Sequence, residues 1–292
     1  MSHWTLGIIG GSGLYEIDGL EDRREERVDT PWGAPSDALV HGRIGDVNLV
    51  FLPRHGRGHR LAPGEVPYRA NIAALKMAGV TDVLAISACG SLQEQYAPGD
   101  FIAADQFIDR TFARPKTFFG EGMVAHVSMA HPVCSRFSGL AAEAAELAGA
   151  KVHRGGTYIA IEGPQFSSFA ESQLYRQWGC DVVGMTAMPE AKLAREAELP
   201  YAILGMVTDY DCWREEVEAV TVTNVLEIIA HNSALGRKTL VELAGILNGT
   251  HRTPSPDGID TCLDFALITA PAARDPQTIH KLQAIAGRAL SG

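Results

Sequence analysis

The chain has 292 residues, of which 46% are hydrophobic and 21% are charged. Its net charge of −10 argues against a nucleic-acid-binding surface, because binding the phosphate backbone requires a basic stripe. No stretch is long and apolar enough to span a bilayer, and the start, MSHWTLGIIGG, lacks the pattern of a secretory signal, so we expect a cytoplasmic protein that binds no membrane.

Five cysteines are scattered along the chain without a C-x-x-C pair, which indicates reduced, structural thiols. The length is sufficient for one large α/β domain with a sizeable core. We therefore expect residues 1–248 to form the main domain. Residues 249–292 are expected to form a tail with a final helix, packed on or extending the same domain.

The first apolar run, residues 6–9, leads into a Gly-Gly-Ser-Gly sequence and predicts a buried strand with a glycine turn at its end. Backbone N–H groups of such a turn can hold an oxyanion, helped by the Ser12 hydroxyl. The rival interpretation is a dinucleotide-binding fingerprint. The pattern G-x-G-x-x-G read from Gly11 places Glu16 where the third glycine belongs, and no G-x-x-x-x-G-K-[ST] sequence occurs.

Residues 39–40 and 47–52 predict a hairpin whose second strand leads into the cationic segment PRHGRGH. His55 and His59 are four residues apart and could bind a metal ion on a helix, but the two intervening glycines make a helix improbable. A solvated surface loop is the simpler alternative. We favour anion binding, because Arg54 at the end of a buried strand offers a planar fork of donors that suits phosphate.

The middle of the chain alternates predicted helices with buried runs. The strand predicted at residues 83–86 opens into Ser87 and Ala88, which places another hydroxyl at a strand end. Residues 111–132 predict an irregular surface excursion that carries His126. The other elements expected here are helices at 68–78 and 135–148 and strands at 101–104 and 157–162, with a further helix through Trp178.

The clearest pattern lies between residues 182 and 213, where an apolar run, a helical segment and a second apolar run follow one another. Strand, helix, strand is the parallel crossover unit. Met185 and Thr186 should therefore meet Asp209 and Asp211 at one carboxyl edge of the sheet, where α/β proteins bind ligands. The remaining expectations are a long helix at 222–244, a linker at 249–256, and a last helix capped by Asp275 that ends near Leu290.

Polar side chains at four predicted strand ends, among them those of Arg54, Ser87 and Thr186, together suit one tetrahedral anion. The motifs around them are GIIGGSGL, VDTPWGAPSDAL, PRHGRGH, ISACGSL, DQFIDRT, IEGPQFSS, GMTAMPE and VTDYDCW. In this order the motifs resemble those of the purine nucleoside phosphorylase superfamily, and within it the branch that cleaves 5′-methylthioadenosine. The resemblance makes residues 1–248 the phosphorylase domain.

The resemblance also implies the site residues. Phosphate would be bound by Ser12, Arg54, His55, Ser87, Ala88 and Thr186. Met185 would lie against the ribose, Phe166 and Ser167 would border the purine, and Asp209 and Asp211 would stand at its edge. The pocket for the 5′ substituent would be lined by Val222, Val225 and Leu226, with His59 nearby and His126 reaching in from a neighbouring subunit of a homotrimer.

The chemistry fits these residue types. Phosphate attacks the anomeric carbon as the purine leaves, so the ribose becomes cationic while negative charge builds on the base. A protonated Asp209 hydrogen-bonded to N7 would neutralise that charge. Such an acid must keep its proton near neutrality, and burial together with a second carboxylate at Asp211 favours the protonated form.

The fold implied is a three-layer α/β/α arrangement with a mixed central sheet, and the reaction yields adenine and 5-methylthio-α-D-ribose 1-phosphate. Neither a metal nor an organic cofactor is expected, since inorganic phosphate is a co-substrate. The alternative within the fold is a phosphorylase for 6-oxopurine nucleosides or methylthioinosine. Asparagine in place of Asp209 and glutamate in place of Ser167 would mark the nucleoside version, and neither is present. A nucleotide-binding regulatory protein is the alternative from another class, and an intact Arg54 argues against it.

Overall fold

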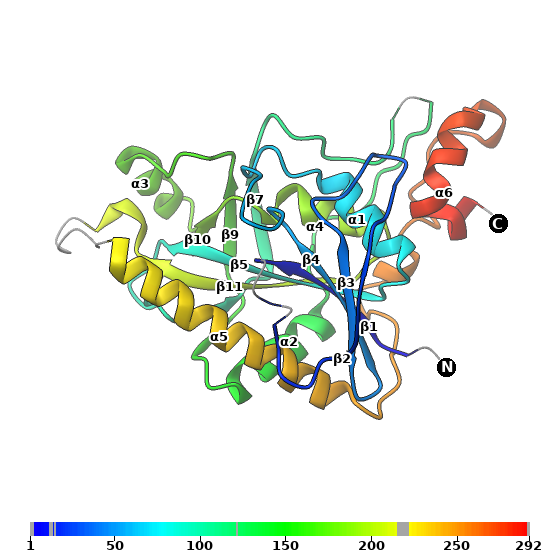
Figure 1. Cartoon of the computed structure of the whole chain (residues 1–292). Coiled ribbons are helices and arrows are strands. Elements are labelled where there is room, and N and C mark those ends of the chain that lie inside the picture. The colour runs from blue at the N-terminus through cyan, green and yellow to red at the C-terminus, as the bar shows by residue number, and fades with distance from the viewer. Residues whose placement is uncertain (1–2, 12–13, 15, 121, 215–221, 291–292) are drawn as a thin grey trace.

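The computed structural model describes residues 3–11, 14, 16–120, 122–214 and 222–290, the side chains of 222–226 excepted. A twisted mixed sheet runs through the molecule with helices on both faces (Figure 1). In the described residues the sheet has 11 strands, and β2-β3-β4-β1-β5-β10-β9-β7 is its main order. The strands are β1 Thr5–Gly10, β2 Glu21–Glu26, β3 Leu39–Ile44, β4 Val47–Pro53, β5 Asp82–Ser91, β6 Phe101–Ala103, β7 Gln106–Arg110, β8 Val152–Arg154, β9 Thr157–Ile161, β10 Val182–Gly184 and β11 Tyr201–Asp209.

Two apolar cores, one on each face of the sheet, define the three layers. Alternate residues of a strand serve opposite faces: in β5, Val83 belongs to one core and Leu84 to the other. The first core is covered by α1 Tyr68–Met77, α4 Ala187–Glu196 and α6 Pro276–Leu290, and the second by α2 Ser135–Leu147 and α5 Val222–Leu247. A further helix, α3 Phe169–Gln177, covers a smaller cluster that contains Trp213. The expected α/β/α class with a mixed sheet is confirmed.

Strand β5 is the centre of this sheet. It runs parallel to β1 and β11, and at its far end Gly90 and Ser91 pair antiparallel with β10. The expectation of a strand that ends at Ile86 is wrong, because the extended conformation continues through Ser87 to Ser91. The expectation of a simple parallel crossover from β10 to β11 is also wrong, since β5 lies between them and runs antiparallel to β10 where they pair.

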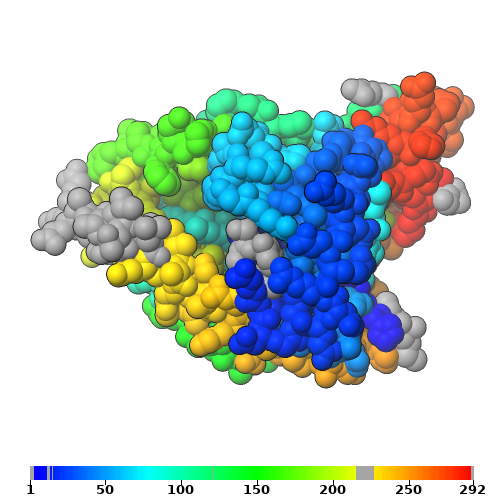
Figure 2. All heavy atoms as spheres, viewed as in Figure 1, coloured from blue at the N-terminus to red at the C-terminus, as the bar shows by residue number. Residues whose placement is uncertain are grey.

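The C-terminal tail is fastened to the main sheet at several points. The Trp4 indole donates to Thr250 Oγ1 at 3.0 Å, and Arg252 pairs with the fully buried Asp82. The final helix begins where the sequence predicts, with Asp275 accepting a hydrogen bond from the Thr278 N–H at 2.6 Å. This helix lies at the end of the molecule opposite α3, as Figures 1 and 2 show.

Three short strands are not predicted by the sequence pattern: β2, β7 and β8. Strand β2 has the sequence EDRREE and is an edge strand with mostly exposed side chains, so it lacks the apolar alternation that marks a strand. All five cysteines are free thiols, as expected. Among the described helices, none combines the length and apolar character needed to cross a membrane.

Candidate active site

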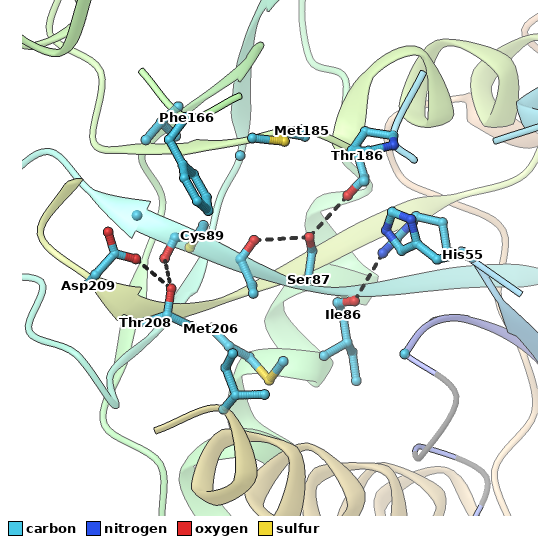
Figure 3. Close-up of a pocket in the computed structure, with 18 of the residues that line it drawn as sticks. His55, Ile86, Ser87, Cys89, Phe166, Met185, Thr186, Met206, Thr208 and Asp209 are labelled. Carbon is cyan, nitrogen blue, oxygen red and sulfur yellow. Dashed lines mark hydrogen bonds between the residues drawn. The ribbon is translucent and has the colours of Figure 1, made fainter. Parts of the chain in front are cut away.

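A cavity of about 460 Å³ lies where β4, β5, β10 and β11 converge beneath one face of α5. Its wall contains most of the residues that the sequence singled out, and Figure 3 shows several of them directed toward one another across it. These are Arg54, His55, His59, Ser87, Ala88, Phe166, Ser167, Met185, Thr186, Asp209 and Asp211.

The remaining expected residues are not placed in this wall. Ser12 lies outside the described residues, and so do the side chains of Val222, Val225 and Leu226, although these three belong to the first turns of α5. His126 lies in the wall of a separate hollow of about 410 Å³, with Phe119 among its neighbours. Within its own chain, His126 is therefore not a residue of the main cavity.

Arg54 follows β4 and is buried, with 2% of its side chain exposed. Its guanidinium forms a bidentate pair with Glu190 of α4, at 2.8 Å from Nε to Oε2 and 3.0 Å from Nη2 to Oε1. The Tyr201 hydroxyl donates to the same carboxylate at 2.9 Å. Burial alone would lower the pKa of Arg54, but the Glu190 carboxylate outweighs it and the pKa is raised. The planar edge of the Arg54 guanidinium that was expected to face phosphate thus faces Glu190. This ion pair fixes the guanidinium in the cavity wall.

Two hydroxyls stand next to this ion pair. Ser87 Oγ of β5 and Thr186 Oγ1, at the start of α4, are 3.1 Å apart, and both residues are buried. Figure 3 shows the two hydroxyls directed toward each other and joined by this hydrogen bond. Ala88 follows Ser87 and is open to the cavity. Hydroxyls held in this way can both turn their protons to an anion.

His55 is held as a neutral ring. Its Nδ1–H donates to the Leu61 carbonyl at 2.8 Å, and the ring stacks on that of His59 with centroids 4.3 Å apart. Burial lowers the pKa of His55 to about 4, and the Arg54 cation contributes to the shift. Among the described residues, no group of three potential metal ligands occurs, so the histidine pair finds no third ligand there.

The two carboxylates form the opposite end of the cavity. Asp209 Oδ1 accepts from the Thr208 hydroxyl at 2.7 Å, and Oδ2 accepts from the Asp211 N–H at 3.0 Å. Asp211 has φ 48°, and its buried Oδ2 has no hydrogen-bond partner within the described structure. The same is true of Ser167 Oγ. Burial raises the pKa of Asp211, and the Asp209 carboxylate adds to the shift. This end therefore offers polar atoms that a ligand could satisfy.

Apolar side chains separate the two polar ends. Met206 of β11 and Ile229 of α5 line the wall together with Met185, which follows β10. Phe166 also borders the cavity, yet 86% of it is exposed. A flat apolar ring at an open edge can cover an aromatic ligand that binds beneath it.

Arg114 is a buried residue that the sequence analysis missed. Its guanidinium donates to the Met188 carbonyl at 2.9 Å and to the Tyr68 hydroxyl at 3.0 Å, and it pairs with Glu162 at 3.1 Å. It also donates to the Met185 carbonyl. Arg114 thus fixes the backbone on both sides of Thr186. The DQFIDRT motif ends three residues earlier, so no pattern in the sequence marked it.

The segment that carries His126 is held by the C-terminal tail. The His126 N–H donates to the Ala266 carbonyl at 2.9 Å, and the Ile268 N–H donates to the Val124 carbonyl at 2.9 Å. Phe265, next to this contact in the tail, is 97% exposed. The tail is therefore part of the surface around His126, which the sequence analysis left without a role.

Comparison with known proteins gives a consistent result. The model of the phosphorylase superfamily matches residues 5–242. An S-methyl-5′-thioadenosine phosphorylase of Cereibacter sphaeroides is 58% identical, with 98% of this chain and 99% of the relative aligned. A solved methylthioadenosine phosphorylase from an antarctic soil metagenomic library has a TM-score of 0.92 at 44% identity, covering 98% of this chain and 99% of the other. The Schistosoma mansoni methylthioadenosine phosphorylase in complex with adenine has a TM-score of 0.81 at 38% identity, and the alignment covers 93% of this chain and 99% of the other.

Proposed function

Because this chain belongs to the phosphorylase superfamily, we propose that it cleaves 5′-methylthioadenosine with inorganic phosphate, giving adenine and 5-methylthio-α-D-ribose 1-phosphate. It is then a pentosyltransferase of purine and methionine salvage. One observation carries the proposal: a single cavity joins two facing hydroxyls and a buried guanidinium at one end to a pair of carboxyls at the other. The apolar wall between the two ends suits a nucleoside with an uncharged 5′ substituent.

The phosphate is bound at the end formed by Ser87, Thr186 and Arg54. The two hydroxyls donate to phosphate oxygens. The Arg54 guanidinium supplies a positive charge, and its ion pair with Glu190 holds it in place. The bound dianion lies below the anomeric carbon and stabilises the positive charge that develops on the ribose. Attack then forms the C–O bond to phosphate as the bond to the purine breaks.

The purine leaves toward Asp209 and Asp211. The two carboxyls together hold one proton, and donation from Asp209 to N7 neutralises the charge that builds on the leaving base. Asp211 Oδ2 and Ser167 Oγ have no partner among the described residues and are available to the 6-amino group of adenine, directly or through water. A 6-oxopurine presents two acceptors at this edge, so the same pair of carboxyls favours adenine.

Several properties follow from the same proposal. The reaction needs no metal and no organic cofactor, because phosphate itself is the nucleophile. The active unit is a homotrimer in which His126 closes the 5′ end of a neighbour's site, which is supported by its position in a hollow away from its own cavity. Free thiols at all five cysteines support a reducing, cytoplasmic location.

Product analysis tests the reaction. The protein is incubated with methylthioadenosine, adenosine, methylthioinosine or inosine, each with and without phosphate, and the base and sugar products are separated. We expect adenine and the sugar 1-phosphate from methylthioadenosine with phosphate, and almost no cleavage without it. Free methylthioribose released at an undiminished rate in phosphate-free buffer would mean a hydrolase. Preferential cleavage of the inosine compounds would favour the 6-oxopurine alternative.

Sedimentation tests the assembly. We expect a trimer at assay concentrations, and a His126→Ala variant with a raised KM for the nucleoside and an unchanged KM for phosphate. His131→Ala, at another histidine of the same excursion, is the control. A fully active monomer would refute the shared site, whereas a normal His126→Ala enzyme would refute only the role of that side chain.

A further inference from the structure

Tyr158 of β9 is the most conspicuous buried polar side chain beside the cavity. The residue is 0% exposed, and its hydroxyl has no hydrogen-bond partner within the described structure. Leaving a buried hydroxyl unpaired costs free energy, so such a group in a well-packed sheet calls for an explanation.

The position of this hydroxyl depends on Gly184 of β10. A Cβ atom on Gly184 would lie 1.8 Å from the Tyr158 oxygen and 2.5 Å from Cζ, so the tyrosine occupies the space that a side chain at position 184 would need. The Tyr158 oxygen therefore lies beside Gly184, which is itself a residue of the cavity wall. Burial raises the pKa of Tyr158, and the nearby Ser87 side chain and Thr186 backbone act in the opposite direction, which places the hydroxyl next to both residues.

A count of protons shows what the hydroxyl can do there. Ser87 Oγ donates to the Ala88 carbonyl at 3.2 Å, so the 3.1 Å hydrogen bond between Ser87 Oγ and Thr186 Oγ1 is donated by Thr186. A phosphate dianion needs both protons, because its exposed oxygens are acceptors. Once both hydroxyls turn to the anion, the buried Ser87 oxygen loses its donor. A third hydroxyl proton is then needed.

We propose that Tyr158 is a positioning residue for phosphate, which donates to Ser87 Oγ when phosphate is bound and so directs the Ser87 proton at the anion. The chain of donors runs from Tyr158 to Ser87 to phosphate, while Thr186 donates separately. Burial raises the pKa of Tyr158 to about 12, so the hydroxyl keeps its proton throughout the assay range. This inference rests on the proposed phosphorolysis.

The test is the Tyr158→Phe variant, which keeps the ring and removes only the hydroxyl. We expect the KM for phosphate to rise about two- to tenfold, the loss of one buried hydrogen bond, with the KM for methylthioadenosine and kcat at saturating phosphate unchanged. Tyr96→Phe, at a partly buried tyrosine that packs on His153, is the matched control and should leave all three unchanged. An unchanged phosphate KM in Tyr158→Phe would overturn the proposal.

A double-mutant cycle separates this role from a general packing effect. If Tyr158 acts through Ser87, the Ser87→Ala/Tyr158→Phe enzyme should have the same phosphate KM as Ser87→Ala alone. Full additivity, or equal losses for phosphate and nucleoside, would mean that Tyr158 only supports the fold. A wild-type enzyme indifferent to phosphate would instead refute the proposed function. Phosphate dependence with no effect of Tyr158→Phe would refute the inference alone.

Discussion

The two polar ends of the cavity are built in different ways. At the phosphate end, charge and hydroxyls already have protein partners: Arg54 is locked to Glu190, and Ser87 faces Thr186. At the purine end, Asp211 Oδ2 and Ser167 Oγ are buried and have no partner in the part of the chain that the structure describes, and the Phe166 ring is largely exposed. To receive its ligand, the first end needs only to turn hydroxyl protons from protein acceptors to the anion. The second end becomes complete only when a base is present.

Because of this difference, removing a side chain at one end should affect stability and binding differently from removing a side chain at the other end. Removing a group at the phosphate end leaves its protein partner buried and unpaired, so stability and affinity should fall together. Removing the Ser167 hydroxyl or the Phe166 ring at the purine end should impair nucleoside binding and leave the ligand-free protein about as stable. Each variant should therefore be examined by kinetics and by thermal unfolding.

The largest kinetic effect is expected at the purine end. Asp209→Asn supplies an amide donor without an acid, so kcat for methylthioadenosine should fall by at least about a hundredfold. The ratio of kcat/KM should shift toward methylthioinosine, and the Tm should change little. Asp105→Asn, at a carboxylate that accepts from the Gly156 N–H, is the control. A variant with wild-type rate and wild-type preference for adenine would show that Asp209 is not the acid.

At the phosphate end, Arg54→Ala should raise the KM for phosphate about ten- to a hundredfold, because a charge-assisted contact is lost. It should also lower the Tm, since Glu190 is left as a buried charge without its partner. The Arg54→Met/Glu190→Gln double variant should recover most of the Tm but none of the phosphate affinity. Recovery of both would show that Arg54 serves the fold alone.

A smaller effect is expected from Phe166→Ala. Loss of an aromatic contact should raise the KM for methylthioadenosine about two- to tenfold and leave the phosphate KM and the Tm unchanged. Phe112→Ala removes another exposed aromatic ring, 82% exposed and outside the wall of the cavity, and is the control. A fall in Tm comparable to that of Arg54→Ala would contradict the contrast between the two ends.

The smallest effect concerns pH. The pKa of His55 is lowered from 6.5 to about 4 in the folded state, so below pH 6.5 the unfolded chain binds a proton that the folded protein does not. Stability is therefore lost as the pH falls from 6.5 toward 4, by about 1 to 2 kcal/mol near pH 5. His55→Asn should remove this part of the pH dependence, measured by denaturant unfolding between pH 5 and 7. Identical slopes for both proteins would argue against a neutral buried ring.

The sequence predicts the elements whose side chains alternate or repeat. Buried runs and helical periodicity were enough for β1, β4, β11, α1 and α2, and the cap at Asp275 was enough for α6; all of these elements pack on a core. They were not enough for β2, because an exposed edge strand of charged residues has no apolar face. The apolar pattern also could not show that β5 continues beyond Ile86. There the extended conformation is stabilised by pairing with β10 and β11 and not by an apolar run in the local sequence.

The identity of most site residues could be predicted from the order of the motifs along the chain. The side-chain partners of these residues could not be predicted when the partners lie far away in the sequence. Arg54 could be singled out, but its pairing with Glu190, 136 positions away, follows from the packing of α4 against β5, β9 and β11 and not from either local sequence. Arg114 is similar, since its contacts are mainly with backbone carbonyls. Every residue has a backbone carbonyl acceptor, so no sequence pattern indicates which carbonyls a buried arginine will contact.

The central place of β5 also has a consequence for the order of folding. Its ten residues are paired with strands that begin at Thr5, Val182 and Tyr201, so the sheet joins segments nearly two hundred positions apart. Closing such long loops is slow, and the apolar VLAIS run has no complete set of partners until β11 has been synthesised. We expect that a newly made chain cannot form the phosphate-binding end of the cavity until residue 209 has left the ribosome. Until then its exposed apolar strands should make it prone to aggregation.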